Sequence, residues 1–416
     1  MNKIAFLTLG CKLNYAETST YERQFVKAGL EVVAWREKAD IYLINTCSVT
    51  AMADTKSRNL IRKVHRINPD AIVIVTGCSA QLRAEQIKHI EGVSRIFDAE
   101  SKSKVVSETL KMIGIQTQDC NEEGRVFGAY SSGERTRSFL KVQDGCDNFC
   151  RYCTVPYARG RSRNIPISQC VKYAEEIASQ GIHEIVLTGV NTGDFGRSTG
   201  ESFLDLLKAL NKVEGIERYR ISSIEPNLLS TEIIDWIAEG NTKFQAHFHI
   251  PLQSGCDDLL KAMGRKYDTA FFAEKIAYIR QKLETPGKSK VFFGIDLMVG
   301  LPGETEEMFN RSVAFLEAIR PAYIHVFPYS KRPGTPAAQM AGQVEESIKA
   351  QRVAVIEQLC ETLHKEFTEL NRGVKETVLW ETSNRKGMME GYTGNYIRLS
   401  QAFDPARAGC LEEVII

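Results

Sequence analysis

The segment that decides the fold is Asp144-Gly145-Cys146-Asp147-Asn148-Phe149-Cys150-Arg151-Tyr152-Cys153. Its three cysteines are separated by three residues and then by two. Three thiolates on one short loop can hold three corners of a four-iron, four-sulfur (4Fe–4S) cluster. The fourth iron is then free to bind a small molecule, and an open metal position is typical of catalysis rather than of structure. The segment therefore predicts a catalytic cluster held by one loop.

The spacing, with the aromatic Tyr152 before the last cysteine, resembles the signature of the radical S-adenosylmethionine (SAM) enzymes. In those enzymes the open iron binds the amino and carboxylate groups of SAM. A structural zinc loop is the alternative, because Cys150 and Cys153 form a plausible half-site. A zinc loop needs a fourth ligand, however, and no His or Cys follows before Cys170. The cluster is therefore the favoured interpretation.

The composition indicates a large enzyme without a membrane anchor. A chain of 416 residues, 43% of them hydrophobic, is expected to form two or three domains. The net charge of +1 means that any nucleic-acid site must be a local patch. We find no secretory signal and no apolar run long enough to span a bilayer, so the expected location is the cytoplasm. Eleven cysteines in that compartment indicate metal or redox chemistry rather than disulfides.

The first part of the chain alternates strand-like and helical segments. Buried strands are predicted at 4–9, 40–45 and 71–76, and a helix is predicted at 16–28. This alternation predicts an open parallel sheet with helices packed on it.

Each of these three strands is followed by a cysteine, namely Cys11, Cys47 and Cys78. The carboxyl ends of parallel strands lie on one edge of a sheet, where such folds bind ligands. The three cysteines are therefore expected to converge and to form a second metal site. Buried apolar cysteines would explain any one of them, but not why all three follow a strand.

The middle of the chain repeats a strand-helix unit six times. The predicted strands are 139–142, 184–187, 218–221, 247–250, 291–295 and 323–326. The clearest helices between them are 168–179, 203–212 and 269–283. Six such units predict an incomplete parallel barrel, whose lateral opening admits a bulky substrate.

Polar and glycine residues at the carboxyl ends of these strands are candidates for SAM contacts, as active sites on barrels lie at that face. A turn glycine after a strand is common, so each position alone is weak. The candidate SAM-binding residues, including the aromatic one of the cysteine loop, are Tyr152, Gly189, Asn191, Ser223, Glu225, Gln253, Ser254 and Met298.

Local charge indicates an acidic partner. The stretch 55–66 carries five Lys or Arg and no acidic residue, and 157–163 is similarly one-sided. Such clusters contact phosphates. A solvated helix face explains the first stretch equally well, and the second less well, because it follows the cysteine loop. The candidate RNA-binding residues are Lys56, Arg58, Arg62, Arg159, Arg161, Arg163 and Arg332.

The last part of the chain has a different pattern. A long amphipathic helix is predicted at 344–370. It is followed by strands at 377–381, 390–399 and 411–416, which predict a small β-barrel of a kind that binds RNA.

Together these parts resemble the methylthiotransferases, over essentially the whole chain. That family combines a cysteine-bearing α/β domain, a radical SAM barrel and a terminal TRAM-like β-barrel. The corresponding boundaries here are 1–120, 132–370 and 371–416. The chain stops at 413–416, where further strand sequence is expected, so the TRAM-like module is expected to be shortened.

Within the family, the segments 9–14 and 155–163 resemble the MtaB branch, as does the pair Glu17-Thr18. That branch adds a methylthio group to C2 of N6-threonylcarbamoyladenosine beside the tRNA anticodon. Two branches remain as alternatives: MiaB, which acts on isopentenyladenosine in tRNA, and RimO, which acts on a ribosomal-protein aspartate. A non-enzymatic iron-sulfur RNA-binding protein is a remote alternative.

The resemblance implies two 4Fe–4S clusters and SAM as cofactors. The cluster on Cys146, Cys150 and Cys153 would cleave SAM to a 5′-deoxyadenosyl radical, and a second cluster, on the strand-end cysteines, would supply the sulfur. A tRNA anticodon loop is the expected partner because its bases are unstacked at low cost. We also expect a monomer that receives electrons from a flavodoxin or ferredoxin and does not contact a membrane. The other cysteines are expected to be core or incidental thiols: Cys120, Cys170, Cys256, Cys360 and Cys410.

Overall fold

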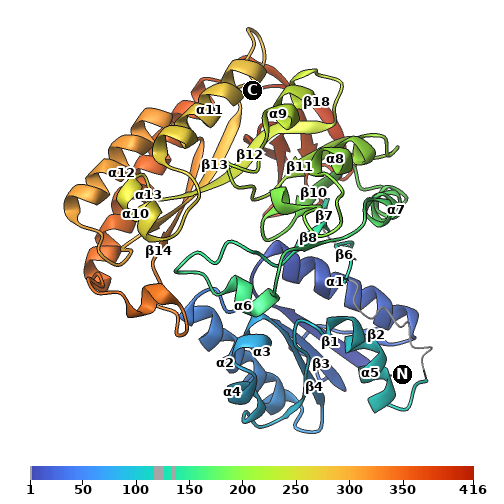
Figure 1. Cartoon of the computed structure of the whole chain (residues 1–416). Coiled ribbons are helices and arrows are strands. Elements are labelled where there is room, and N and C mark those ends of the chain that lie inside the picture. Colours follow the sequence, from blue (N-terminus) through green and yellow to red (C-terminus); the bar gives the residue numbers. More distant parts are fainter. Residues whose placement is uncertain (1, 117–125, 134–135) are drawn as a thin grey trace.

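The computed structural model describes residues 2–116, 126–133 and 136–416 (Figure 1). Three main sheets organise these residues: a five-stranded sheet near the N-terminus, a seven-stranded sheet in the middle and a four-stranded sheet near the C-terminus. A separate two-stranded hairpin flanks the cysteine loop. The α/β class and the order of its three parts are those predicted from the sequence.

The N-terminal sheet is parallel throughout, with the strand order β2-β1-β3-β4-β5. Its strands are β1 (Lys3–Thr8), β2 (Glu31–Val32), β3 (Ile41–Thr46), β4 (Ile72–Gly77) and β5 (Val93–Ile96). Its helices are α1 (Lys12–Lys27), α2 (Ala51–Ile67), α3 (Cys78–Leu82), α4 (Ala84–Lys88) and α5 (Val105–Met112), with a 3₁₀ turn at Lys102–Lys104. Every residue of β3 is buried. Because strand side chains alternate between faces, α1 and α5 pack on one face and α2 and α4 on the other.

Helix α1 begins earlier than the sequence predicted. It starts at Lys12, directly after Cys11, rather than at Ala16. The reason is a tertiary contact: the Asn14 side chain donates hydrogen bonds to the carbonyls of Leu9 and Thr46 at 2.8 and 3.0 Å. Those bonds hold the first turn of α1 against two strand ends, which sequence periodicity alone does not reveal.

The central sheet has the order β14-β13-β12-β11-β10-β7-β6. Six of its strands are parallel, and only the short edge strand β6 (Ala129–Tyr130) is antiparallel to its neighbour. The parallel strands are β7 (Arg137–Lys141), β10 (Glu184–Thr188), β11 (Arg218–Ile221), β12 (Phe244–Gln253), β13 (Phe292–Val299) and β14 (Tyr323–Pro328). The order does not close β14 onto β7, so the predicted partial barrel of six strand-helix units is confirmed.

Helices on the outside of this barrel complete its core. They are α7 (Ile167–Ala178), α8 (Phe203–Asn211), α9 (Thr231–Ala238), α10 (Asp257–Ala262), α11 (Thr269–Leu283) and α12 (Glu306–Ile319). Several begin with a capping side chain; Ser202, for example, accepts a hydrogen bond from the Asp205 N–H at 3.0 Å. The hairpin strands β8 (Gln143–Asp144) and β9 (Arg163–Asn164) enclose the cysteine loop and the short helix α6 (Val155–Arg159). Two more 3₁₀ turns lie at Thr192–Asp194 and Pro336–Gln339.

The C-terminal part follows the long helix α13 (Glu346–Glu369). Its antiparallel strands are β15 (Lys375–Trp380), β16 (Met388–Thr393), β17 (Arg398–Ala402) and β18 (Leu411–Ile415), in the order β17-β16-β15-β18. The single strand predicted at 390–399 is two strands, because Tyr396 adopts a φ of +67° and reverses the chain. The result is an open sheet, consistent with a TRAM-like module, and not a closed barrel.

The three parts meet around the barrel (Figure 1). Helix α1 contacts β6 and β7, and α6 contacts α3. On another side, Arg218 and Arg220 of β11 donate to backbone carbonyls of the C-terminal sheet, including Tyr392 at 3.1 Å and Gly394 at 2.8 Å. None of the helices in the described ranges combines the length and the apolar character needed to cross a membrane.

Candidate active site

The cysteine loop opens onto a cavity of about 380 Å³, which we call the loop cavity. Cys146, Cys150 and Cys153 all line it. Each sulfur has a hydrogen-bond donor: the Asn148 N–H lies 3.5 Å from Cys146 Sγ, and the Val155 N–H lies 3.4 Å from Cys153 Sγ.

The third donor is a side chain from elsewhere in the chain. Arg265, which follows α10, places Nη1 3.1 Å from Cys150 Sγ. The same guanidinium forms an ion pair with Glu225 at 2.7 Å. No spacing or periodicity in the sequence identified Arg265, because it lies in a short loop that contains no recognisable motif.

Burial works against free thiolates in this loop. It raises the pKa of Cys146 to about 11 and that of Cys153 to about 12, while the backbone donors act in the opposite direction. The thiols of Cys146 and Cys153 are therefore protonated at neutral pH until a metal displaces the protons. Three sulfurs that face N–H donors suit ligands that carry negative charge when metal is bound, so this loop fits an iron-sulfur cluster.

Most of the predicted SAM contacts share the loop cavity. The residues that line it are Tyr152, Asn191, Ser223, Glu225, Gln253 and Met298. The amide nitrogen of Asn191 is buried without a hydrogen-bond partner, although its oxygen faces the Glu225 N–H at 3.4 Å. A buried, unpaired donor beside the three cysteines fits a ligand that carries carboxylate or hydroxyl oxygens, as SAM does.

Two of the predicted SAM contacts do not reach this cavity. The Ser254 hydroxyl is buried, accepts a hydrogen bond from the Cys256 N–H and lies 3.5 Å from the Ser312 hydroxyl. The α-carbon of Gly189 faces Gln143, whose Oε1 would lie 2.9 Å from an added Cβ. Neither residue is among those that line the cavity: the Ser254 hydroxyl is turned into the protein, and Gly189, which has no side chain, packs against Gln143.

The strand-end cysteines Cys11, Cys47 and Cys78 follow three adjacent parallel strands, β1, β3 and β4. Gly10 brings two of them together. It has a φ of +103°, and a Cβ at this position would lie 2.9 Å from Cys47 Sγ. Gly77 before Cys78 is equally constrained, with a φ of +97° and only 2.3 Å between a built Cβ and the Thr46 oxygen. Both positions require glycine.

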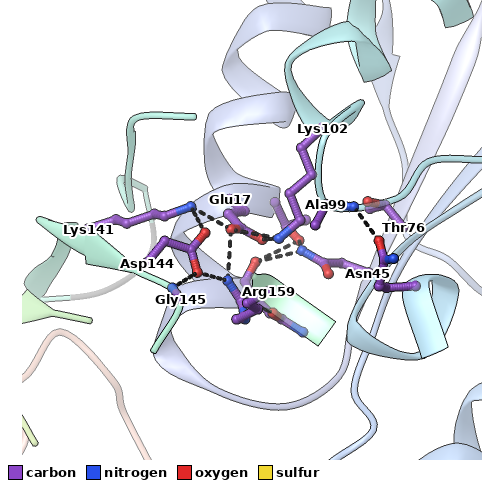
Figure 2. Close-up of polar contacts among 12 residues, drawn as sticks. Glu17, Asn45, Thr76, Ala99, Lys102, Lys141, Asp144, Gly145 and Arg159 are labelled. Carbon is purple, nitrogen blue, oxygen red and sulfur yellow. Dashed lines mark hydrogen bonds and ion pairs between the residues drawn. The ribbon is translucent and has the colours of Figure 1, made fainter. Parts of the chain in front are cut away.

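A group of buried ionised side chains lies beside these cysteines, and we call it the buried charge cluster (Figure 2). Glu17 of α1 is at its centre. It accepts two hydrogen bonds from Lys102 at 3.0 Å, one from Lys141 at 2.8 Å and one from Arg159 at 3.2 Å. Asp144 pairs with Lys141 at 2.7 Å and with Arg159 at 2.9 Å. All five side chains are buried, so the cluster joins α1, the barrel strand β7 and the hairpin of the cysteine loop.

Arg159 links the two sets of cysteines. It follows the cysteine loop in sequence, and its Nη2 donates to Asn14 Oδ1. The amide of Asn14 in turn holds the carbonyls that precede Cys11 and Cys47. Burial raises the pKa of the Cys78 thiol, while Arg159 and Lys102 act in the opposite direction.

The charges in this region fit a second cluster. Three cations of the buried charge cluster face two carboxylates, which leaves one positive charge next to the strand-end cysteines. Thiolates bound to iron would balance it. Within the described ranges, no three His, Cys, Asp or Glu side chains are placed to share a single metal ion. A four-iron cluster needs no such arrangement, because each thiolate can bind its own iron.

The structure corrects two of the predicted RNA contacts. Arg159 is buried within the charge cluster described above. Arg332 is also buried, forms an ion pair with Asp54 and donates to the Ser48 hydroxyl at 3.0 Å. Neither guanidinium can reach a phosphate, because carboxylates from other parts of the chain already bind it.

The other candidate RNA contacts are accessible. Lys56 and Arg62 are exposed on α2, where Arg58 is half-buried. Arg161 is exposed and its guanidinium lies 4.9 Å from the centre of the Phe149 ring, while Arg163 is half-buried.

A second and larger cavity, of about 930 Å³, opens at the side of the barrel, and we call it the barrel cavity. Barrel strands, the first residue of α1 and the C-terminal sheet all contribute to its walls. Aromatic and basic side chains predominate, including Phe139, Phe292, Tyr392, Arg220 and Arg398. Such a lining suits a nucleobase with an anionic group. The two cavities share a wall, because His249 of the barrel cavity is 3.0 Å from Asp296 of the loop cavity.

The remaining cysteines show no common site. Cys170, Cys256 and Cys360 are buried in hydrophobic cores, and Cys410 is exposed. Cys120 lies outside the described residues.

Comparisons with known proteins agree with this site. The model of the radical SAM superfamily matches residues 140–316, and that of the uncharacterized protein family UPF0004 matches residues 3–98. The radical SAM methyltransferase TsrM from Kitasatospora setae has a TM-score of 0.58 at 14% identity, over 81% of this chain and 77% of TsrM, and shows a shared fold. The partial barrel and its cysteine loop are those of a radical SAM enzyme.

Sequence relatives narrow the class further. The threonylcarbamoyladenosine tRNA methylthiotransferase MtaB of Bacillus subtilis is 38% identical over 414 residues, which cover 96% of this chain and 90% of that protein. The tRNA-2-methylthio-N(6)-dimethylallyladenosine synthase of Alkaliphilus oremlandii is 31% identical over 390 residues, covering 91% and 81%. The chain belongs to the methylthiotransferase family. Its cofactors are accordingly SAM and 4Fe–4S clusters.

Proposed function

We propose that this enzyme adds a methylthio group to C2 of N6-threonylcarbamoyladenosine beside the anticodon of tRNA. The relatives named MtaB support that nucleoside. One structural observation supports the chemistry: Cys146, Cys150 and Cys153 line the loop cavity, and residues close in sequence to two of the strand-end cysteines line the cavities at the barrel. Lys12, next to Cys11, lines the barrel cavity, and Val49 and Thr50, shortly after Cys47, line the loop cavity.

Each set of cysteines has its own role in this proposal. Cys146, Cys150 and Cys153 would hold the SAM-binding cluster, and Cys11, Cys47 and Cys78 the second one. Bound there, the cofactors supply a radical that can remove the hydrogen from an aromatic C–H bond, and the sulfur that replaces it.

The protein groups orient and enclose these cofactors. Arg265 donates to the Cys150 sulfur and fixes Glu225 at the wall of the loop cavity. Asn191 offers its free amide N–H to an oxygen of SAM. Tyr152, Ser223, Gln253 and Met298 form the rest of the SAM contact surface. The buried charge cluster holds the two cysteine-bearing regions in register.

The partners follow from the same reaction. Phosphates of the anticodon arm would contact the accessible basic residues, which are Lys56, Arg58, Arg62, Arg161 and Arg163. A flavodoxin or ferredoxin would supply electrons. We place the enzyme in the cytoplasm as a monomer, with domains at 1–120, 132–370 and 371–416.

Mass spectrometry of tRNA nucleosides tests the substrate. Cells that lack the gene should retain N6-threonylcarbamoyladenosine and lose its 2-methylthio derivative, and a plasmid copy should restore the derivative. A plasmid copy with Cys150→Ala should not restore it. Loss of the methylthio group from isopentenyladenosine instead would assign the enzyme to the other tRNA branch. Unchanged tRNA nucleosides would contradict both tRNA substrates and would favour the remaining alternative, the aspartate of a ribosomal protein.

A further inference from the structure

The barrel cavity contains a lysine, Lys12, that forms no ion pair with any carboxylate of the described residues. Lys12 lines the cavity, and its ammonium lies 5.9 Å from the centre of the Phe139 ring. Within the described part of the chain, no carboxylate oxygen lies within ion-pair distance of it. Glu381, which lines the cavity, pairs with Arg137 at 3.1 Å, and Asp296, in the wall shared with the loop cavity, lies 3.0 Å from His249.

Most other cations of this cavity are compensated. Arg220 pairs with Glu184 at 2.8 Å, and Arg398 with Glu390 at 3.5 Å. The histidines add little positive charge: burial lowers the pKa of His247 well below its usual range, and that of His325 also falls. Arg385 is the other cavity cation with no carboxylate partner in the described ranges, but it lies between β15 and β16, far in sequence from the cysteines.

The surroundings of Lys12 favour binding of an anion. The guanidinium groups of Arg137 and Arg220 line the same cavity as Lys12. An anion bound at the ammonium of Lys12 would give this side chain the counter-charge that it lacks among the described residues. A charge-assisted hydrogen bond in such a setting is about twice as strong as one between neutral groups.

The position of Lys12 indicates which anion it would bind. It adjoins Cys11, and therefore the group that would deliver sulfur to C2 of the base. In a ureido-substituted adenine, the distal ureido N–H can hydrogen-bond to N1. That bond folds the amino-acid part toward the edge of the base that carries C2. A carboxylate on this substituent then comes close to whatever group faces C2.

We propose that Lys12 binds the carboxylate of the N6-threonylcarbamoyl group and so selects this nucleoside over adenosines with an uncharged N6 substituent. The proposal rests on the function proposed above and adds the residue that reads the substrate. An apolar isopentenyl group would leave Lys12 partly desolvated and unpaired, which disfavours binding.

Binding to anticodon stem-loop RNAs tests the proposal. The RNAs carry N6-threonylcarbamoyladenosine, its threonine methyl ester or unmodified adenosine, and the proteins are reconstituted wild type, Lys12→Met and Lys12→Arg. Dissociation constants come from fluorescence anisotropy, and iron content and electron paramagnetic resonance (EPR) spectra verify both clusters. We expect wild type to prefer the acid over the ester by about tenfold or more. Lys12→Met should abolish the preference by weakening acid binding alone, and Lys12→Arg should retain it.

Two control variants separate this role from general RNA affinity. Lys27→Met removes an exposed lysine at the far end of the same helix, and Arg385→Met removes the other uncompensated cation of the cavity. Neither should change the preference for the acid. If Lys12→Met weakens binding of all three RNAs equally, the proposal is overturned, because Lys12 would then contact a phosphate that the three RNAs share. If Arg385→Met loses the preference for the acid, Arg385 and not Lys12 binds the carboxylate.

The wild-type comparison decides the matter even if Lys12→Met fails to load iron. A wild-type enzyme that binds acid and ester equally well contradicts carboxylate recognition by any residue. Single-turnover methylthiolation separates this failure from failure of the proposed function. A wild type that modifies the acid RNA while Lys12→Met keeps the preference refutes only the role of Lys12. A wild type that modifies none of these RNAs refutes the function itself.

Discussion

Replacement of Glu17 by glutamine is predicted to destabilise the protein more than any single surface substitution. Glu17 is fully buried and bonded to Lys102, Lys141 and Arg159. Glutamine has nearly the same shape but no charge. Three cations would then face Asp144 alone, away from water. Removal of one partner from a buried ion pair costs about 3–5 kcal/mol. Since whole domains are stable by only about 5–15 kcal/mol, this is a large fraction.

Urea unfolding of the iron-free protein, followed by circular dichroism, measures this effect. The matched control is Glu369→Gln, which breaks an ion pair of 2.6 Å with Arg372 at the exposed end of α13. Exposed pairs contribute about 0–1 kcal/mol, so the control should unfold almost like wild type. Combining Glu17→Gln with Lys141→Met restores the original charge balance and should cost less than the two single changes added together.

The difference in free energy of unfolding between wild type and Glu17→Gln should depend on pH in a definite direction. The three cations lower the pKa of Glu17 from its ordinary value of 4.5, although burial alone would raise it. A carboxyl with a lowered pKa in the folded state contributes stability above its unfolded pKa and loses it as the pH falls. The difference in free energy of unfolding between wild type and Glu17→Gln should therefore be constant near pH 7 and should become smaller below about pH 4.5. If the free energy of unfolding of Glu17→Gln is within about 1 kcal/mol of the wild-type value at pH 7, the buried charge cluster does not stabilise the fold as argued.

Three further substitutions probe the cysteines. Gly10→Ala places a Cβ 2.8 Å from Cys47 Cβ, so it should reduce the iron bound per protein by about half. The control Gly29→Ala, also at positive φ but with open space around it, should leave the iron content unchanged. Equal iron content in the two variants would contradict the steric argument. Cys47→Ala should abolish methylthiolation while SAM cleavage, measured as 5′-deoxyadenosine, continues, and loss of neither would refute the role given to the second cluster. Arg265→Met removes the donor to Cys150 and should lower the reduction potential of the SAM-binding cluster in an EPR titration; an unchanged potential would show that this contact does not tune the cluster.

Much of the site follows from local sequence because strand ends are local features. A cysteine after each of three predicted strands, with Cys11 as the first, required only that the strands be parallel neighbours, and β1, β3 and β4 are. The spacing of Cys146, Cys150 and Cys153 needed no tertiary information at all. Side-chain direction at strand ends was less predictable, as Ser254 shows: its position was foreseen, but its hydroxyl is turned into the protein.

The two wrong predictions of RNA contacts share one physical cause. Arg159 and Arg332 were expected to contact RNA because basic residues without nearby acidic neighbours in sequence are usually exposed. In the structure Glu17 and Asp54, more than 100 residues away in sequence, bury and neutralise them. For the same reason the contact of Arg265 with the cysteine loop was not predicted, because its partners also come from distant segments.

The sequence by itself determined the class of enzyme, through three cysteines on one loop and three more at the ends of parallel strands. These features depend on spacing along the chain, and spacing survives folding unchanged. Only the tertiary structure decided which charges are buried and which remain free for a substrate, because an ion pair depends on distance in space. It placed Arg159, a candidate RNA contact, as a link between the two cysteine sites, and it placed Lys12 in the barrel cavity without an ion-pair partner among the described residues.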